Sequence, residues 1–144
     1  MIKRIACLLL TLMLFVSGCA SQTFPYTLAT ESMLPAFLDS APATVREAYR
    51  FAMNNMDEME NYPCYCGCGS MGHTSNLSCY IKDVDTAGNS TFDEHAAGCG
   101  ICVDITQDVM RLLREGKSSV EIRTYIDATY SAFGPSTDTP LPQG

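Results

Sequence analysis

The spacing of hydrophobic positions predicts a first amphipathic helix in the middle of the chain. Apolar side chains recur at intervals of three and four residues from Val45 to Met59, the period of a helix with one buried face. Pro42 is a favoured first-turn residue and Ser40 is a candidate cap before it. Pro63 ends the helix, because a proline pushes the preceding residue out of the helical region.

Two further helices are predicted in the second half of the chain. The first runs from Asp93 to Glu115 with a stripe of apolar and thiol side chains, and Gly116 stands where a left-handed C-terminal cap belongs. Ser118 and Glu121 have the spacing of a capping box and begin the last helix. Gly134-Pro135 ends that helix.

Residues 63–91 follow neither the helical nor the strand period. Gly67, Gly69, Gly72 and Gly88 interrupt them, and only residues 77–84 have the composition of a short strand or turn. A loop this long is unusual in a small domain unless ligands or disulfides hold it. We therefore expect an all-α fold, a small domain of about three helices around an irregular Cys-rich knuckle that binds metal.

The N-terminus has the pattern of an export signal. Lys3 and Arg4 precede an apolar run from Ile5 to Val16, which is too short for a membrane-spanning helix. The run ends in Val16-Ser17-Gly18-Cys19, which resembles a bacterial lipobox. In a lipoprotein of this kind Cys19 would become the first residue and carry the lipid (palmitate). The alternative is an ordinary signal peptide followed by a coincidental cysteine.

These patterns divide the chain into four parts and place it at the cell envelope. The predicted parts are a lipoprotein signal peptide (1–18), a lipid-anchored tether (19–40), a Cys-rich helical metal-binding domain (41–134) and a disordered tail (135–144). The location is the extracytoplasmic side of a bacterial membrane, with the membrane itself as a partner through the lipid on Cys19.

The charge of the chain restricts its partners. Removing residues 1–18 of the 144 leaves 126 and takes Lys3 and Arg4 from nine basic residues that face 16 acidic ones, so the net charge becomes −9. Such a domain repels nucleic acid and attracts cations. We expect no nucleic-acid partner.

Six cysteines and two histidines fall within residues 64–102. The candidate metal ligands are Cys64, Cys66, Cys68, His73, Cys79, His95, Cys99 and Cys102. The last three lie at i, i+4 and i+7 of the predicted helix and therefore share one face. Asp93 precedes His95 as a candidate partner that would orient its ring. Sites dominated by thiolates favour Cu(I), and zinc is the second candidate.

Two alternatives remain open for the same cysteines. An exported domain could pair all six in disulfides, with no metal; the two histidines at ligand spacing favour metal. Cys99-x-x-Cys102 could serve thiol–disulfide exchange, but it lies inside the predicted helix and not at its activating N-terminus. The sequence has neither a Gly-rich phosphate loop nor a Ser/His/Asp set, so we predict no catalytic residues and no enzymatic activity.

The string Pro63-Cys64-Tyr65-Cys66-Gly67-Cys68 resembles the signature of the PCYCGC-motif lipoproteins, small exported bacterial proteins. Similarity extends over about residues 45–130. It includes Gly72-His73, Cys79-Tyr80, Phe92-Asp93-x-His95-Ala96, Cys99-x-x-Cys102, and the stretch from Gly116-Lys117-Ser118 to Arg123-x-x-Ile126-Asp127. The resemblance implies a lipid anchor and metal binding, and it names no ion. A protein that donates or accepts the metal is the further partner we expect.

Overall fold

A computed structural model describes residues 24–143 of the chain. The predicted signal peptide (1–18) and Cys19 therefore lie outside the described residues. The described residues form four α-helices: α2 (Ala43–Asn54), α3 (Met56–Met59), α4 (Gly100–Arg114) and α5 (Ser119–Tyr130). Two strands, β1 (Ile81–Val84) and β2 (Ser90–Phe92), form a small antiparallel sheet. Among the described residues, no helix has the length and apolar character needed to cross a membrane.

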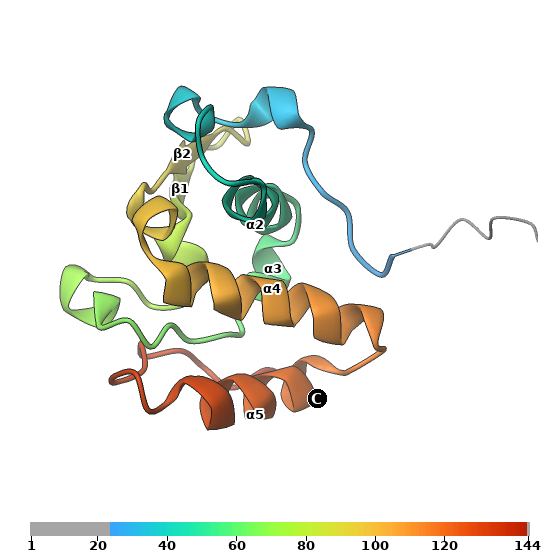
Figure 1. The fold of residues 1–144 in the computed structure, drawn as a ribbon, viewed down its shortest axis with the longest axis vertical. Helices are drawn as coiled ribbons and strands as arrows, with labels where there is room; N and C mark the ends of the chain where they lie inside the picture. Colours follow the sequence, from blue (N-terminus) through green and yellow to red (C-terminus); the bar gives the residue numbers. More distant parts are fainter. Residues whose placement is uncertain (1–23, 144) are drawn as a thin grey trace, which may run out of the picture.

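Helix α4 is the centre of the fold, with α2 packed on one side and α5 on the other (Figure 1). Its buried face includes Ile105, Val109 and Met110, which the three-and-four spacing of the sequence places together. The Cys-rich loop passes beside the N-terminal end of α4 (Figure 1). The loop is thus attached to the most buried helix of the domain.

The predicted first helix is interrupted at Asn55. The Asn55 backbone leaves the helical region at φ −136° and ψ 45°, and its side-chain amide donates to the carbonyls of Phe51 (2.7 Å) and Thr27 (2.8 Å). An asparagine side chain that bonds nearby backbone competes with the helix. The chain resumes as α3 and turns toward the Cys-rich loop.

The strand pair corrects the all-α prediction. Ile81 pairs with Phe92 and Val84 with Ser90, around a turn in which Asp85 Oδ1 accepts the N–H groups of Ala87 and Asn89. Every residue from 82 to 89 is exposed, so the sequence lacks the alternation of apolar and polar residues by which a strand is recognised. The domain is mainly helical with one small sheet.

Two segments expected to lie outside the domain are packed against it. In the predicted tether, Ala29 and Leu38 are buried and the Ala29 N–H donates to the Arg50 carbonyl at 3.0 Å. In the predicted disordered tail, Thr137 and Thr139 are buried. Backbone and hydroxyl hydrogen bonds hold both segments, and composition does not reveal such long-range partners.

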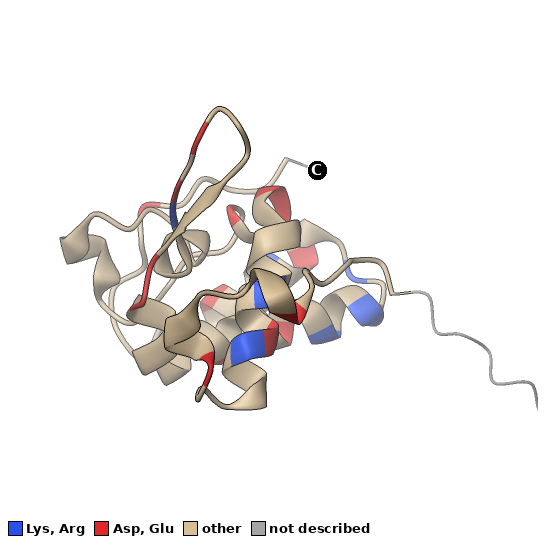
Figure 2. Ribbon diagram, turned by 90° about the horizontal axis from the view of Figure 1, so that it is seen from above, with Lys and Arg blue, Asp and Glu red and all other residues tan. Residues whose placement is uncertain are grey.

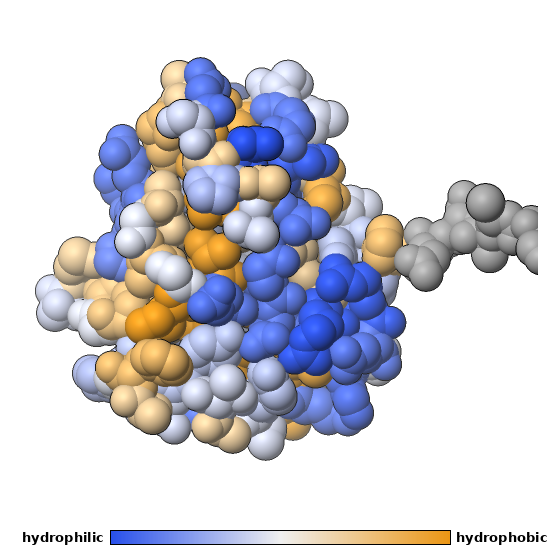
Figure 3. Space-filling model, in the orientation of Figure 1, coloured by the Kyte–Doolittle hydropathy of each residue, from blue (hydrophilic) through white to orange (hydrophobic). Residues whose placement is uncertain are grey.

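Charged residues avoid the Cys-rich loop. Residues 61–80 contain no Lys, Arg, Asp or Glu, and Figure 2 shows the basic side chains gathered mainly on the helices. Figure 3 shows apolar surface where the loop meets the start of α4 and hydrophilic surface on the opposite side. Within residues 61–80, therefore, no lysine or arginine side chain would repel a bound cation.

Candidate metal centre

All eight candidate ligands converge beside the N-terminal end of α4. Seven of their side-chain donor atoms form two groups, and within each group the atoms lie no more than 4.8 Å from one another. The outer group contains Cys66, His95, Cys99 and Cys102; the inner group contains Cys64, Cys68 and Cys79. The names follow burial, because all three inner cysteines are buried whereas three outer residues are partly exposed.

His73 adjoins the inner group without belonging to it. Its Nδ1 atom lies 3.4 Å from Cys79 Sγ, and Cys79 Sγ lies 3.6 Å from Cys68 Sγ. The His73 ring meets the His95 ring edge to face, with 5.3 Å between the centroids. The two predicted imidazoles therefore stand next to each other, one beside each group.

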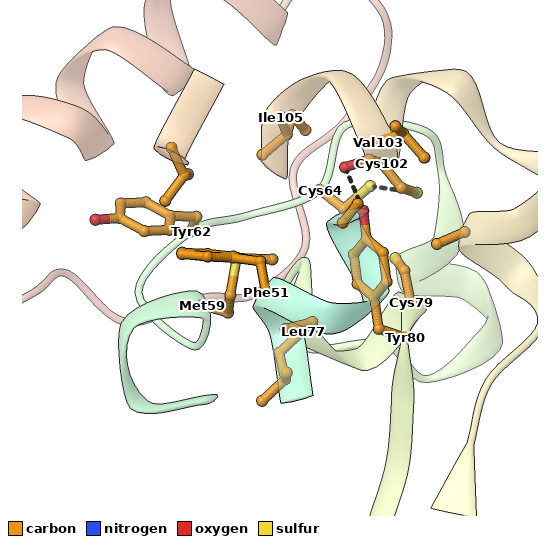
Figure 4. Close-up of a cluster of buried hydrophobic side chains, with 14 of the residues drawn as sticks. Phe51, Met59, Tyr62, Cys64, Leu77, Cys79, Tyr80, Cys102, Val103 and Ile105 are labelled. Carbon is orange, nitrogen blue, oxygen red and sulfur yellow. Dashed lines mark hydrogen bonds between the residues drawn. The ribbon is translucent and has the colours of Figure 1, made fainter. Parts of the chain in front are cut away.

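Cys64 connects the groups. Its Sγ atom lies 3.3 Å from Cys66 Sγ and 3.4 Å from Cys102 Sγ, and Cys102 Sγ lies 3.7 Å from Cys66 Sγ. Figure 4 shows Cys64, Cys79 and Cys102 directed toward one another at one end of the core, beside the ring of Tyr80. The donors thus form one continuous cluster.

The loop reaches this cluster through two tight turns at glycine. Gly67 has φ 84° and Gly72 has φ 92°, a region that costs other residues about 1 kcal/mol or more. Between them the 3₁₀ turn η4 (Cys68–Met71) places Cys68 inward. Gly67 reverses the chain between Cys66 and Cys68, which sends these two thiols to different groups.

The model of the family described as "Protein of unknown function with PCYCGC motif" matches residues 8–142. The chain belongs to this PCYCGC family. The match covers nearly the whole chain and includes every candidate ligand, which confirms the resemblance drawn from residues 63–68. Neither the curated proteins nor the solved structures gave a match.

One part of the PCYCGC cluster differs from the sequence prediction. His95 lies in a separate 3₁₀ turn, η6 (His95–Gly98), and Cys99 is the extended N-cap of α4. The three residues converge through this bend and not along one helix face. Gly98 and Gly100 flank the bend and weaken a continuous helix there. Cys99-x-x-Cys102 consequently sits at a helix N-terminus and not inside a helix.

Asp93 supports both histidines of the PCYCGC cluster. Its Oδ1 accepts the His95 backbone N–H at 2.7 Å, and its Oδ2 lies 3.6 Å from His73 Nε2 and 3.7 Å from Lys82 Nζ. Tyr49 Oη donates to the Asp93 carbonyl at 2.6 Å. A carboxylate beside a ligand histidine fixes its ring. Asp93 is therefore placed to orient His73, whereas it contacts only the backbone of His95, whose ring it was predicted to orient.

Three core side chains form hydrogen bonds with the backbone carbonyl of Cys102. Tyr80 Oη donates to the Cys102 carbonyl at 2.9 Å, and Asn76 Nδ2 donates to the same carbonyl at 3.2 Å. Thr106 Oγ1 also contacts it, at 3.1 Å. Tyr80 and Asn76 were not predicted as site residues, because neither is a usual ligand of a thiophilic ion. They make the buried wall of the cluster rigid.

The C-terminal tail fixes Cys64. The Thr137 N–H donates to the Cys64 carbonyl at 3.0 Å, and the Cys64 N–H donates to Thr137 Oγ1 at 2.9 Å. Thr139 Oγ1 donates to the Thr74 carbonyl at 2.6 Å. No motif in residues 135–144 signalled this contact. The tail nevertheless straps the motif loop to the domain.

The sulfur atoms share protons unequally. Hydrogen bonds from Cys102 and Cys79 hold the pKa of the Cys64 thiol far below its ordinary value. The same contact with Cys64 raises the pKa of Cys102, and burial raises the pKa of Cys66 and of Cys68. Of these sulfurs, Cys64 is the one whose anionic form its neighbours stabilise.

The sulfur spacing fits a thiophilic ion. The triangle of Cys64, Cys66 and Cys102 has edges of 3.3, 3.4 and 3.7 Å, so the point equidistant from the three sulfurs lies about 2.0 Å from each. Zinc–thiolate bonds of about 2.3 Å would set sulfurs about 3.8 Å apart in a tetrahedron. The observed sulfur–sulfur distances are therefore slightly shorter than those expected around a bound ion, and the thiols would move apart slightly to bind it.

Proposed function

We propose that this protein binds a thiophilic metal ion, Cu(I) foremost, at its Cys/His cluster and holds it at the cell envelope for sequestration or delivery. The observation that carries the proposal is the convergence of six thiols and one imidazole in two adjoining groups, with a second imidazole, His73, beside them. Buried thiols are costly to leave as unpaired thiolates, and a bound cation would neutralise them.

The donor set favours a soft ion. Six of the eight donors are sulfur and none of the grouped donors is a carboxylate. Thiolates select Cu(I), zinc and iron–sulfur centres over magnesium or calcium. Zinc is the second candidate because three cysteines and one histidine, the composition of the outer group, form a common structural zinc site.

The sulfur network is less suited to a set of disulfides. A disulfide pairs each sulfur with one other at about 2.05 Å, whereas Cys64 has Cys66 and Cys102 at nearly equal distances. A disulfide-stapled surface module remains the alternative that the experiment below tests directly.

Thiol–disulfide exchange is a second candidate function because of one observation, the position of Cys99-x-x-Cys102 at the N-terminus of α4. Cys99 is partly exposed and Cys102 is buried, so one could attack and the other resolve. Against this, Cys102 contacts two further sulfurs. We propose a binding protein and not an enzyme.

The proposed location follows from the lipobox-like segment that ends at Cys19. A lipid on Cys19 would anchor the chain to the extracytoplasmic face of a bacterial membrane, with the membrane as partner and no nucleic acid. The proposed delivery role adds a protein that donates or accepts the ion. The apolar surface at the loop (Figure 3) lies where such an exchange would occur.

Elemental analysis combined with thiol titration tests the proposal. The full chain is purified anaerobically, and copper, zinc and reactive thiols are measured before and after chelation. Stoichiometric copper, with thiols that become reactive only after chelation, supports the proposal; zinc supports its second form. A protein with no metal and no reactive thiols in residues 64–102 would be the disulfide-stapled module. Reductase turnover abolished by Cys99→Ser would favour thiol exchange.

A further inference from the structure

We propose that the cluster holds two ions per chain and that the Cys64 thiolate bridges them. This inference rests on the proposed metal-binding function. It concerns how many ions the site takes and which sulfur they share, neither of which follows from metal binding as such.

The number of donors exceeds what one ion uses. A tetrahedral ion takes four ligands, so two such ions that share one sulfur take seven. The outer group supplies four donors: Cys66, His95, Cys99 and Cys102. The inner group supplies three more, with His73 Nδ1 3.4 Å from one of them, Cys79. Each half of the cluster therefore contains or adjoins three cysteines and one histidine.

The two halves are too close together to be separate sites. Cys64 belongs to the inner group, yet its sulfur is 3.3 and 3.4 Å from two outer sulfurs, Cys66 and Cys102. Ligands of one tetrahedral ion are themselves about 3.8 Å apart. Cys64 is thus as near to the outer donors as they would be to one another around a single ion.

Burial keeps Cys64 in this bridging position. Its side chain is fully buried, and both of its backbone polar groups are hydrogen bonded to Thr137. Gly67 lies between Cys66 and Cys68, the two cysteines that follow Cys64, so Cys66 turns outward and Cys68 inward. The alternating Cys-x-Cys-x-Cys spacing thereby gives a shared sulfur and one sulfur for each half.

Cadmium is the probe of choice because it is thiophilic and has an NMR-active isotope. The reduced, metal-free chain is titrated anaerobically with ¹¹³Cd²⁺, and native mass spectrometry counts the ions. A proton–cadmium correlation spectrum then assigns ligands. We expect two ions per chain, two cadmium resonances, and Cys64 β-protons that correlate with both.

The outcomes separate this inference from the function on which it rests. A single cadmium ion per chain would overturn the two-ion inference and leave metal binding intact. Two ions with no cysteine correlated to both would overturn the bridge. Binding of no cadmium at all would instead overturn the proposed function.

Variants give an independent test. Cys99→Ser removes a partly exposed outer donor and should weaken the outer ion while the inner ion stays bound. Cys64→Ser should weaken both ions at least tenfold, because the shared ligand is lost. Met33→Leu removes an exposed sulfur that belongs to neither group and should bind two ions as the unchanged chain does. If Cys64→Ser does not fold, the Cys64 correlations of the unchanged chain decide the matter.

Discussion

Replacing Thr137 by valine tests whether the C-terminal segment, residues 135–143, positions the loop that carries Cys64. Thr137 is only 3% exposed, and its hydroxyl accepts the buried Cys64 N–H at 2.9 Å. Valine keeps the shape and removes the hydroxyl, so the Cys64 N–H loses its partner. An unsatisfied buried donor costs about 1–3 kcal/mol, and at roughly 4 °C per kcal/mol we expect a fall in Tm of about 4–12 °C.

Thr137→Ser is the matched control for this change. Serine keeps the hydroxyl and loses one methyl group, worth about 0.8 kcal/mol when buried. Unfolding is followed by circular dichroism on the reduced, metal-free protein, and Cys64 accessibility by the rate of thiol alkylation. The valine variant should be the less stable of the two and should expose Cys64 faster. Equal Tm values for the two variants would refute the reasoning that the hydroxyl holds the loop.

Four further predictions follow from the described contacts. Asp93→Asn should weaken cadmium binding about 10–100-fold in chelator competition, because the carboxylate beside His73 is lost; Lys82→Gln, the control at the other neighbour of Asp93 Oδ2, should not. Chelation of the loaded protein should be biphasic, with the outer ion leaving first because Cys66, His95 and Cys99 are partly exposed; a single phase in stopped flow would contradict this. Ser118→Ala should lower stability by about 1 kcal/mol through loss of the α5 capping box, with the exposed Ser131→Ala as control. Hydrogen bonds from Ser118 and the Lys117 charge lower the pKa of Glu121 from 4.5 to about 2. The Tm difference between Glu121→Gln and the unchanged chain should therefore persist above about pH 4.5 and close as the pH falls toward 2; a constant difference across that range would exclude the carboxylate as its source.

Helix boundaries that depend on local chemistry were predictable from the sequence. The capping box of Ser118 and Glu121 is present, with both reciprocal hydrogen bonds. Gly116 has φ 77° after α4, as a left-handed cap requires. These signals succeed because each involves residues only a few positions apart, so no distant partner decides the outcome.

Features that depend on distant partners were not predictable. The i, i+4, i+7 spacing of His95, Cys99 and Cys102 suggested one helix, but the contact of His95 Nε2 with Cys66 Sγ at 3.2 Å belongs to a bent segment. The burial of Thr137 likewise depends on a distant residue, Cys64. The sequence therefore indicated which residues gather at the site but not the bends that bring them there.

The packing of Tyr80 against the cluster gives the molecule its own optical reporter. The chain has seven tyrosines and no tryptophan, so its ultraviolet emission comes from phenol rings alone. Tyr80 is fully buried with its hydroxyl on the Cys102 carbonyl, and its ring centroid is 4.8 Å from that of Tyr49. A metal ion bound to the neighbouring thiols would alter the fluorescence of this tyrosine pair. Metal binding could therefore be followed by tyrosine fluorescence in the unlabelled protein.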